Sequence, residues 1–141
     1  MTQASEFRSR TGHLTCAPAE VFEFVTDMRN FKRFVPDGNV DKMDFSRDEC
    51  SFHVASLGNV IMSIERKSPY SDVTYNATLL KIQDLSLVLY INGGSNEKAK
   101  VTITVSAVMN PFMKLMAEKY IIKFLEAIIE EMENFRDWKQ S

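Results

Sequence analysis

Residues 15–37, TCAPAEVFEFVTDMRNFKRFVPD, carry the signals of two short helices in succession. Pro18 suits the first turn of a helix, where its missing N–H costs nothing, and Asp27 suits the N-cap of a second helix. Apolar residues recur at helical spacing in both halves. They are Val21, Phe22, Val25 and Met28 in the first half, and Phe31, Phe34 and Val35 in the second. The segment ends at a turn over residues 36–38, so it predicts two helices whose apolar faces cover another part of the protein.

Residues 40–109 have instead the pattern of β-strands joined by short turns. Residues 99–108, AKVTITVSAV, alternate apolar and polar side chains, as does a strand with one buried face. Turn signals stand at Gly58-Asn59 and at Gln83-Asp84, each between two such strands. The polar-rich segment 5–15 predicts a further strand before the helices. Because consecutive strands with short turns pair antiparallel, the sequence predicts an antiparallel sheet.

Residues 111–138 predict one long amphipathic helix, with Asn110 as its N-cap and Pro111 in its first turn. At the helical repeat one face is apolar; it consists of Ala117, Ile121, Phe124, Leu125, Ile128, Met132 and Phe135. The opposite face is charged; it consists of Lys119, Lys123, Glu126, Glu130, Glu133 and Asp137. Such a helix is roughly 40 Å long, against roughly 26 Å for a strand of eight residues. One helix can therefore cross the whole of a curved sheet.

This order of elements resembles that of the START-like, helix-grip (SRPBCC) superfamily, and in particular its polyketide cyclase/dehydrase-like branch. The resemblance rests on residues 17–37, APAEVFEFVTDMRNFKRFVPD, and on residues 110–135, NPFMKLMAEKYIIKFLEAIIEEMENF. It implies an α+β fold over the single domain 1–141, in which a curved antiparallel sheet of about six or seven strands wraps around the C-terminal helix. It also implies a cavity between sheet and helix that binds a hydrophobic or amphipathic small molecule or a lipid. The two short helices would cover the mouth of this cavity, with Phe31 and Phe34 at its edge; the alternative is that they only seal an ordinary core.

The turns predict which side chains of the strands face the cavity. A two-residue turn at Gly58-Asn59 directs His53 and Met62 inward. The same register leaves Phe52 and Val54 outside, and a slip of one residue inverts the assignment. A two-residue turn at Gln83-Asp84 predicts a second inner set, which is Asn76, Thr78, Leu80, Leu87 and Leu89. The predicted interior is therefore aliphatic with a few polar groups to orient a ligand; the alternative for His53 is a core or rim histidine satisfied by a neighbour.

The first turns of the long helix are apolar almost all the way round, at Phe112, Met113, Leu115 and Met116. Flexible methionines suit a site for ligands of varied shape, but these residues equally suit a dimer contact or burial beneath the N-terminal strand. The complete set of predicted ligand-binding residues is Phe31, Phe34, His53, Met62, Asn76, Thr78, Leu80, Leu87, Leu89, Met113, Met116, Tyr120 and Phe124.

No catalytic constellation is visible in the sequence, and His53 and Tyr120 are only weak candidates for a general acid or base. The histidines and cysteines lack metal-ligand spacing, and the glycines lack a phosphate-binding context, so neither a metal nor a cofactor is expected. Binding, transport or sensing of a hydrophobic small molecule is the leading function. A cyclase or dehydratase that uses the same cavity and a pocketless dimeric interaction module are the alternatives.

The 141 residues carry a formal net charge of -2, which provides no basic surplus for nucleic acid or an anionic membrane. No apolar run approaches the ~20 residues of a membrane span. Cys16 and Cys50 lie far apart in the sequence, and the first residues lack the apolar core of a signal peptide. These features predict a reduced, cytoplasmic protein, either a monomer or a homodimer.

Overall fold

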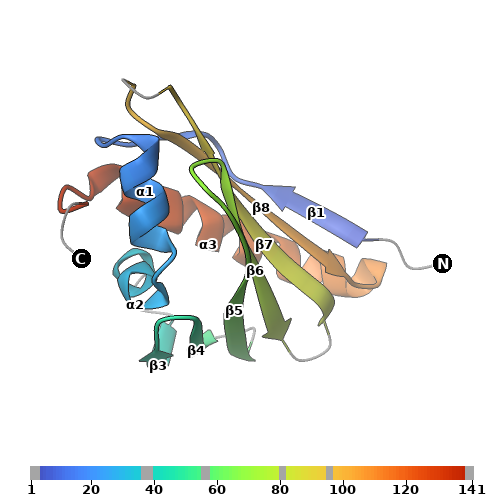
Figure 1. The fold of residues 1–141 in the computed structure, drawn as a ribbon. Coiled ribbons are helices and arrows are strands. Elements are labelled where there is room, and N and C mark those ends of the chain that lie inside the picture. The colour runs from blue at the N-terminus through green and yellow to red at the C-terminus, as the bar shows by residue number, and fades with distance from the viewer. Residues whose placement is uncertain (1–3, 36–39, 55–57, 80–81, 95–96, 139–141) are drawn as a thin grey trace.

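The computed structural model describes residues 4–35, 40–54, 58–79, 82–94 and 97–138. Its strands are β1 (Ala4–Arg8), β2 (Gly12–His13), β3 (Val40–Phe45), β4 (Glu49–Val54), β5 (Gly58–Ser68), β6 (Asp72–Leu79), β7 (Ile82–Asn92) and β8 (Lys100–Val108). They form one 8-stranded sheet in the order β1-β8-β7-β6-β5-β4-β3, with β2 also pairing with β8. Every pairing is antiparallel. The helix α3 (Pro111–Asn134) runs along one face of this twisted sheet (Figure 1).

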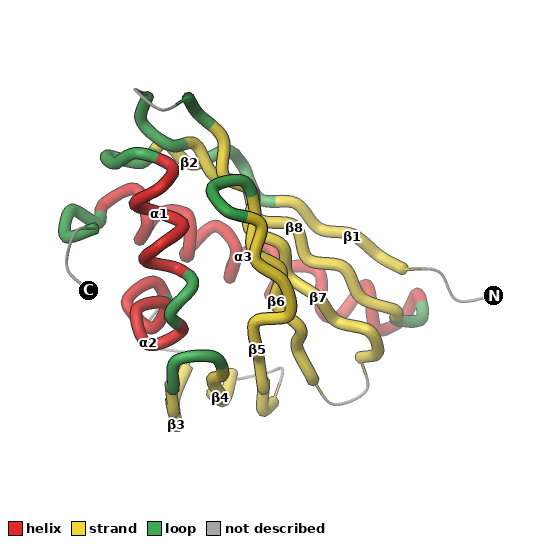
Figure 2. Tube along the Cα trace, in the orientation of Figure 1, coloured by secondary structure: helices red, strands yellow, loops and turns green. Residues whose placement is uncertain are grey.

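The short helices α1 (Pro18–Val25), α2 (Met28–Phe31) and η1 (Lys32–Phe34) lie at the end of the sheet where α3 finishes (Figure 2). The predicted caps are confirmed. The side chain of Asp27 accepts a hydrogen bond of 3.0 Å from the Arg29 N–H at the start of α2. The side chain of Asn110 accepts one of 2.8 Å from the Met113 N–H at the start of α3. Each cap satisfies a backbone donor that the helix itself leaves unpaired.

The α+β helix-grip architecture predicted from the sequence is confirmed. The buried face of α3 consists of Ala117, Ile121, Leu125, Ile128, Ile129 and Met132. The helix ends at Asn134 rather than at Trp138, because the backbone of Phe135 is extended. The predicted first strand is divided into β1 and β2, which both pair with β8. Within the ranges that the structure describes, no helix has both the length and the apolar character to cross a membrane.

The residues of two predicted turns, Gly58-Asn59 and Gln83-Asp84, belong to strands in the structure. Val54 pairs with Gly58, so Gly58 belongs to β5 rather than to a turn. Leu79 pairs with Ile82, and Asp84 lies within β7 at a register shift where its φ is 51°, which marks a β-bulge. Val60 pairs with Phe52 rather than with Leu57, and Leu85 pairs with Ala77 rather than with Ile82, so each pairing is shifted by five residues. A shift by an odd number of residues exchanges the two faces of a strand. The faces predicted for β4 and β6 are therefore wrong, whereas those predicted for β5 and β7 are correct.

The two short helices seal one end of the core. Phe31 is 2% exposed and its ring lies 5.6 Å from that of Tyr75 on β6. Phe34 is fully buried and lies 5.4 Å from the rings of both Phe135 and Trp138, which follow α3. The segment after α3 thus folds back over the short helices and closes an aromatic cluster that sequence periodicity alone did not predict.

Candidate functional site

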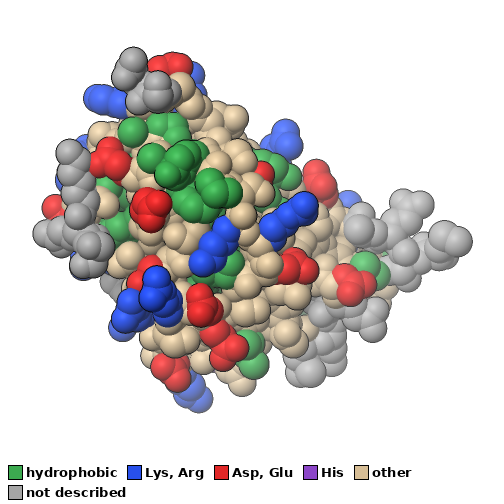
Figure 3. Space-filling view, viewed as in Figure 1, with side chains coloured by type: hydrophobic (Ala, Val, Ile, Leu, Met, Phe, Trp, Pro, Cys, Tyr) green, Lys and Arg blue, Asp and Glu red, His purple; other side chains and the backbone are tan. Residues whose placement is uncertain are grey.

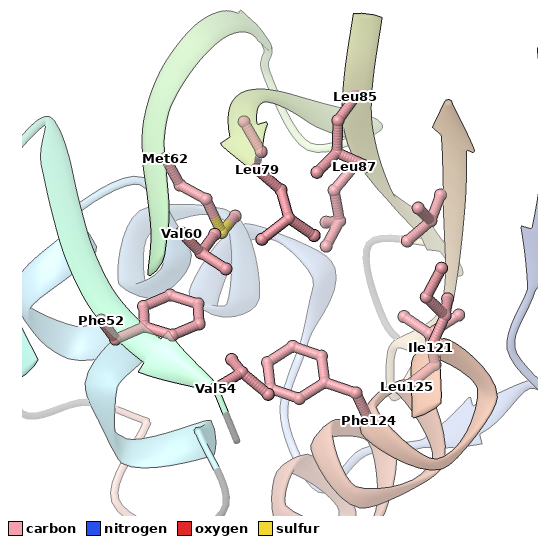
Figure 4. A pocket seen from close by; sticks show the side chains of 12 residues that line it. Phe52, Val54, Val60, Met62, Leu79, Leu85, Leu87, Ile121, Phe124 and Leu125 are labelled. Carbon is pink, nitrogen blue, oxygen red and sulfur yellow. The ribbon is translucent and has the colours of Figure 1, made fainter. Parts of the chain in front are cut away.

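An apolar cavity of about 80 Å³ lies between α3 and the inner face of the sheet (Figure 4). Its wall consists of Phe52, Val54, Val60, Met62, Ala77, Leu79, Leu85, Leu87, Val105, Ile121, Phe124 and Leu125. These side chains come from β4 to β8 and from the middle of α3. All of them are apolar, so the wall contributes no side chain that could donate or accept a conventional hydrogen bond.

The alternation of the strands and the repeat of the helix produce this wall. Phe52 and Val54 are two residues apart on β4 and share its inner face. Ile121, Phe124 and Leu125 have the spacing of neighbours on one side of a helix. Successive inner residues of the strands thus meet one apolar stripe of α3, and the cavity is the space that they leave unfilled.

A stack of aromatic rings connects α3 with the sheet at one side of the cavity. The ring of Phe124 lies 6.2 Å from that of Phe52, at an interplanar angle of 18°. The ring of Phe52 lies in turn 6.3 Å from that of Phe45, at 4°. Phe124 is only partly buried, unlike the other two α3 residues of the wall. Its side chain can therefore move with a smaller loss of packing contacts than that of Ile121 or Leu125.

The dimensions of the cavity limit what it can accept. Ligand pockets for drug-sized molecules enclose roughly 300–1,000 Å³, so a cavity of about 80 Å³ suits a much smaller guest. An apolar cavity without polar partners does not hold water well, and such cavities bind small apolar molecules instead. The arrangement can therefore hold a small apolar molecule, or one apolar group of a larger molecule.

Some of the predicted site residues are brought together here. Met62, Leu87 and Phe124 line the cavity. Leu89 of β7 is buried but is not part of the wall, and Leu80 lies outside the described residues. The prediction missed the inner residues of β4 and β6, which are Phe52, Val54, Ala77 and Leu79. The apolar alternation of Phe52 with Val54 was a signal that could have identified the inner face of β4.

The polar residues predicted to orient a ligand do not face the cavity. The inward orientation expected for His53 is wrong, because Phe52 and Val54 occupy the inner face of β4 and the parity of the strand turns His53 outward. Its Nδ1 instead lies 2.9 Å from the Oδ1 of Asn59. Asn76 and Thr78 are exposed on the outer face of β6 for the same reason.

The remaining predicted residues lie away from the cavity wall. Phe31 and Phe34 belong to the aromatic cluster at the end of the core. Met113 is half-buried against the core, whereas Met116 is 56% and Tyr120 is 36% exposed. The Lys119 Nζ lies 5.3 Å from the centroid of the Tyr120 ring, which is a cation–π contact on the outer side of α3. Neither His53 nor Tyr120 is placed to transfer a proton to a molecule in the cavity.

The buried titratable groups near the cavity stay protonated at neutral pH. Burial raises the pKa of the Cys50 thiol to about 12, so Cys50 is not an activated nucleophile. Burial also raises the pKa of Tyr75, whose hydroxyl donates a hydrogen bond of 3.0 Å to the carbonyl oxygen of Val25. In the part of the chain that the structure describes, no group of histidine, cysteine, aspartate and glutamate side chains could hold a metal ion.

Solved structures of several proteins share this arrangement. A point mutant of norcoclaurine synthase from Thalictrum flavum, in complex with a transition-state analogue, matches with a TM-score of 0.76 and 7% identity over 94% of each chain. A protein from Rhizobium loti matches with a TM-score of 0.62 and 15% identity, over 93% of this chain and 99% of that one. One from Thermobifida fusca matches with a TM-score of 0.62 and 13% identity, over 90% and 92%.

No protein-family model matches the sequence, and no curated protein does so either. At these identities the structural matches establish the fold and not the activity. The matches extend over nearly the whole chain, and they reproduce the order of elements on which the resemblance of the sequence rests. The chain therefore has the helix-grip fold, which it shares with the solved structures of norcoclaurine synthase.

Proposed function

We propose that this protein binds a small hydrophobic molecule, or the apolar part of an amphipathic one, in the cavity between α3 and the sheet. The observation that carries this proposal is the composition of the wall, which is apolar throughout. Burial of apolar area, at roughly 25 cal/mol per Å², is then the main source of affinity. Any polar group of the ligand stays at the mouth of the cavity, where water can solvate it.

Binding accounts for the site better than catalysis does. General acid–base catalysis needs a group within about 3 Å of the proton that it transfers, and none of the wall residues has a titratable side chain. Norcoclaurine synthase has been solved in complex with dopamine and hydroxybenzaldehyde, which supports small-molecule binding as one use of this fold. The low identity gives no ground for assigning the reaction of that enzyme to this chain.

A cavity-filling substitution tests the proposal. Ala77 lines the cavity, so Ala77→Leu adds a branched side chain to the space that a ligand would occupy. Benzene is a suitable probe because small apolar cavities bind it. In wild type, titration with benzene is expected to shift the NMR signals of the wall methyl groups of Val54, Leu79 and Leu87. In the Ala77→Leu variant we expect the affinity for benzene to fall at least about tenfold, at a stability cost of about 1–3 kcal/mol.

The matched control is Thr78→Leu, which adds the same kind of side chain to the next residue of β6. Thr78 is exposed on the opposite face of the sheet, so its substitution leaves the cavity unchanged and benzene binding intact. Wild-type wall methyl signals that do not move at saturating benzene would refute cavity binding. Equal losses in the two variants would show that the shifts do not come from the cavity.

A further inference from the structure

The outer side of the first half of α3 is an exposed apolar face. Phe112 is 68%, Leu115 is 77% and Met116 is 56% exposed. Ile122, one to two turns further along the same side, is 43% exposed. The buried face of α3 lies on the opposite side and packs against the sheet. Exposed apolar side chains that gather on one side of a helix mark an interaction surface, and we call the exposed side of α3 over residues 112–123 the docking face.

The charges on this face all have one sign. Lys119 and Lys123 lie among its apolar residues, since Lys119 is three residues from Met116 and four from Lys123. Neither has a carboxylate within ion-pair distance among the described residues. The single acidic residue of segment 112–123, Glu118, is half-buried on the flank of the helix. On the side of the molecule shown in Figure 3, by contrast, acidic and basic side chains are interspersed.

The second half of α3 carries the compensating acidic residues. Glu126 and Glu133 both form ion pairs with Arg10, at 3.4 Å and 2.7 Å. Glu130 and Glu131 are exposed between them. The formal net charge of -2 therefore conceals a basic, apolar first half and an acidic second half of one helix. Overall charge suggested no attraction to an anionic membrane, but local charge reverses that expectation for the docking face.

We propose that the docking face binds the surface of an anionic lipid bilayer. A helix with large apolar side chains interleaved with lysines lies in the interface of such a bilayer, with its apolar side chains among the acyl chains and its lysines at the headgroups. A second copy of the chain fits this face less well. A two-fold dimer brings the same patch of both copies together, so the lysines of one copy would meet lysines or apolar side chains of the other.

The docking face and the cavity wall use the same part of α3. Ile121 and Phe124 belong to the wall, while Tyr120, Ile122 and Lys123 are exposed beside them. A bilayer bound at the docking face would thus be separated from the cavity only by the roughly 10 Å width of the helix, and could be the source of an apolar ligand. This last step rests on the proposed function, whereas the binding of the bilayer itself does not.

Vesicle co-sedimentation tests the proposal. Vesicles of phosphatidylcholine mixed with an equal part of phosphatidylserine are expected to bind the protein at low salt, and vesicles of phosphatidylcholine alone to bind it far less. Lys119→Gln with Lys123→Gln should weaken binding to the anionic vesicles by about fivefold per lysine. Leu115→Ser with Met116→Ser should weaken it at least about tenfold. Both pairs are exposed, and circular dichroism will establish that the variants are folded.

Matched controls separate these effects from general ones. Lys32→Gln with Lys100→Gln removes the same charge from exposed positions outside the docking face. Ile61→Ser removes an apolar side chain that is 50% exposed on β5. Both controls should bind the anionic vesicles like wild type.

The proposal fails if wild type does not bind the anionic vesicles, or if the docking-face variants bind them as well as the controls do. It also fails if wild type is a dimer that the Leu115 and Met116 substitutions dissociate while vesicles bind neither form. Benzene titration without vesicles keeps the two proposals apart. Vesicle binding without benzene binding refutes only the cavity function, and benzene binding without vesicle binding refutes only the docking face.

Discussion

At the scale of single residues, Tyr75 makes a polar contact inside the core that joins β6 to α1. It is fully buried, and its hydroxyl donates a hydrogen bond to the carbonyl oxygen of Val25, the last residue of α1. Tyr75→Phe keeps the ring contact with Phe31 but leaves this carbonyl without its donor. We expect the free energy of unfolding to fall by about 1–3 kcal/mol, which is the cost of an unsatisfied buried acceptor. Urea denaturation of both proteins measures the difference.

Tyr90→Phe is the control, because Tyr90 lies on the neighbouring strand β7 and is 39% exposed. Its hydroxyl can exchange a protein contact for water, so the substitution should change stability by less than about 0.5 kcal/mol. A Tyr75→Phe variant as stable as this control would mean that the hydrogen bond does not anchor α1 to the sheet.

At the scale of elements, Glu133 connects the end of α3 to β2 and to the segment between β1 and β2. Its carboxylate accepts hydrogen bonds from both terminal nitrogens of Arg10, at 3.1 Å and 2.7 Å, and from the backbone N–H of His13, at 2.9 Å. The hydrogen bond from Arg10 is the largest cause that lowers the pKa of Glu133 from 4.5 to about 2. The folded state therefore favours the charged form of this carboxylate.

A pH dependence of stability follows from this lowered pKa. A carboxyl group whose pKa is lower in the folded state stabilises the fold above its unfolded pKa, and that contribution disappears as the pH falls through its folded pKa. Glu133→Gln should thus cost about 1–2 kcal/mol at pH 7, after allowance for solvent screening of this partly exposed pair. The difference between the variant and wild type should shrink as the pH falls from about 5 towards 2.

Denaturation over this pH range gives the measurement, and Glu130→Gln on the exposed side of the same helix is the control. It should leave stability nearly unchanged, because the Glu130 side chain is exposed and forms no ion pair among the described residues. A constant difference between Glu133→Gln and wild type from pH 7 to pH 3 would contradict the assigned role of the charged form.

The elements also explain which predictions from the sequence succeeded. Helix starts were predictable because Asp27, Asn110 and the prolines act locally, through their own side chains or rings. The faces of β4 and β6 were not, because they depend on where each turn lies to within one residue. Gly58 and Asp84 both have positive φ, at 103° and 51°, yet one opens a strand and the other forms a bulge. Residues typical of turns thus indicated correctly where the backbone is irregular, but they did not show whether the irregularity is a turn, a strand start or a β-bulge.

At the scale of the whole molecule, the cavity exists because α3 and the sheet do not close completely upon each other. Its aliphatic character was predictable from composition and alternation, since any inner face of these strands is mostly apolar. The absence of polar side chains from its wall was not predicted, because the misplaced turns assigned His53, Asn76 and Thr78 to the inner face of the sheet. The aromatic cluster could not be predicted from the sequence either, because it forms only when the residues after α3 fold back onto α1. It consists of Phe24, Phe34, Phe135 and Trp138.

The size of the cavity at this scale depends on Phe124, which joins α3 to β4 through its stack with Phe52. Phe124→Ala removes that connection and enlarges the cavity, so naphthalene should gain affinity relative to benzene by about tenfold through the additional apolar area buried. Because Phe124 is only partly buried, the stability cost should be about 1–3 kcal/mol, below that of a fully buried phenylalanine. Phe112→Ala on the same helix is the control, since Phe112 is 68% exposed and lies outside the wall. Titrations of both variants and wild type with the two ligands measure the ratio of affinities. An unchanged ratio in Phe124→Ala would mean that this ring does not limit what the cavity accepts, and that the strands β4 to β7 set its size instead.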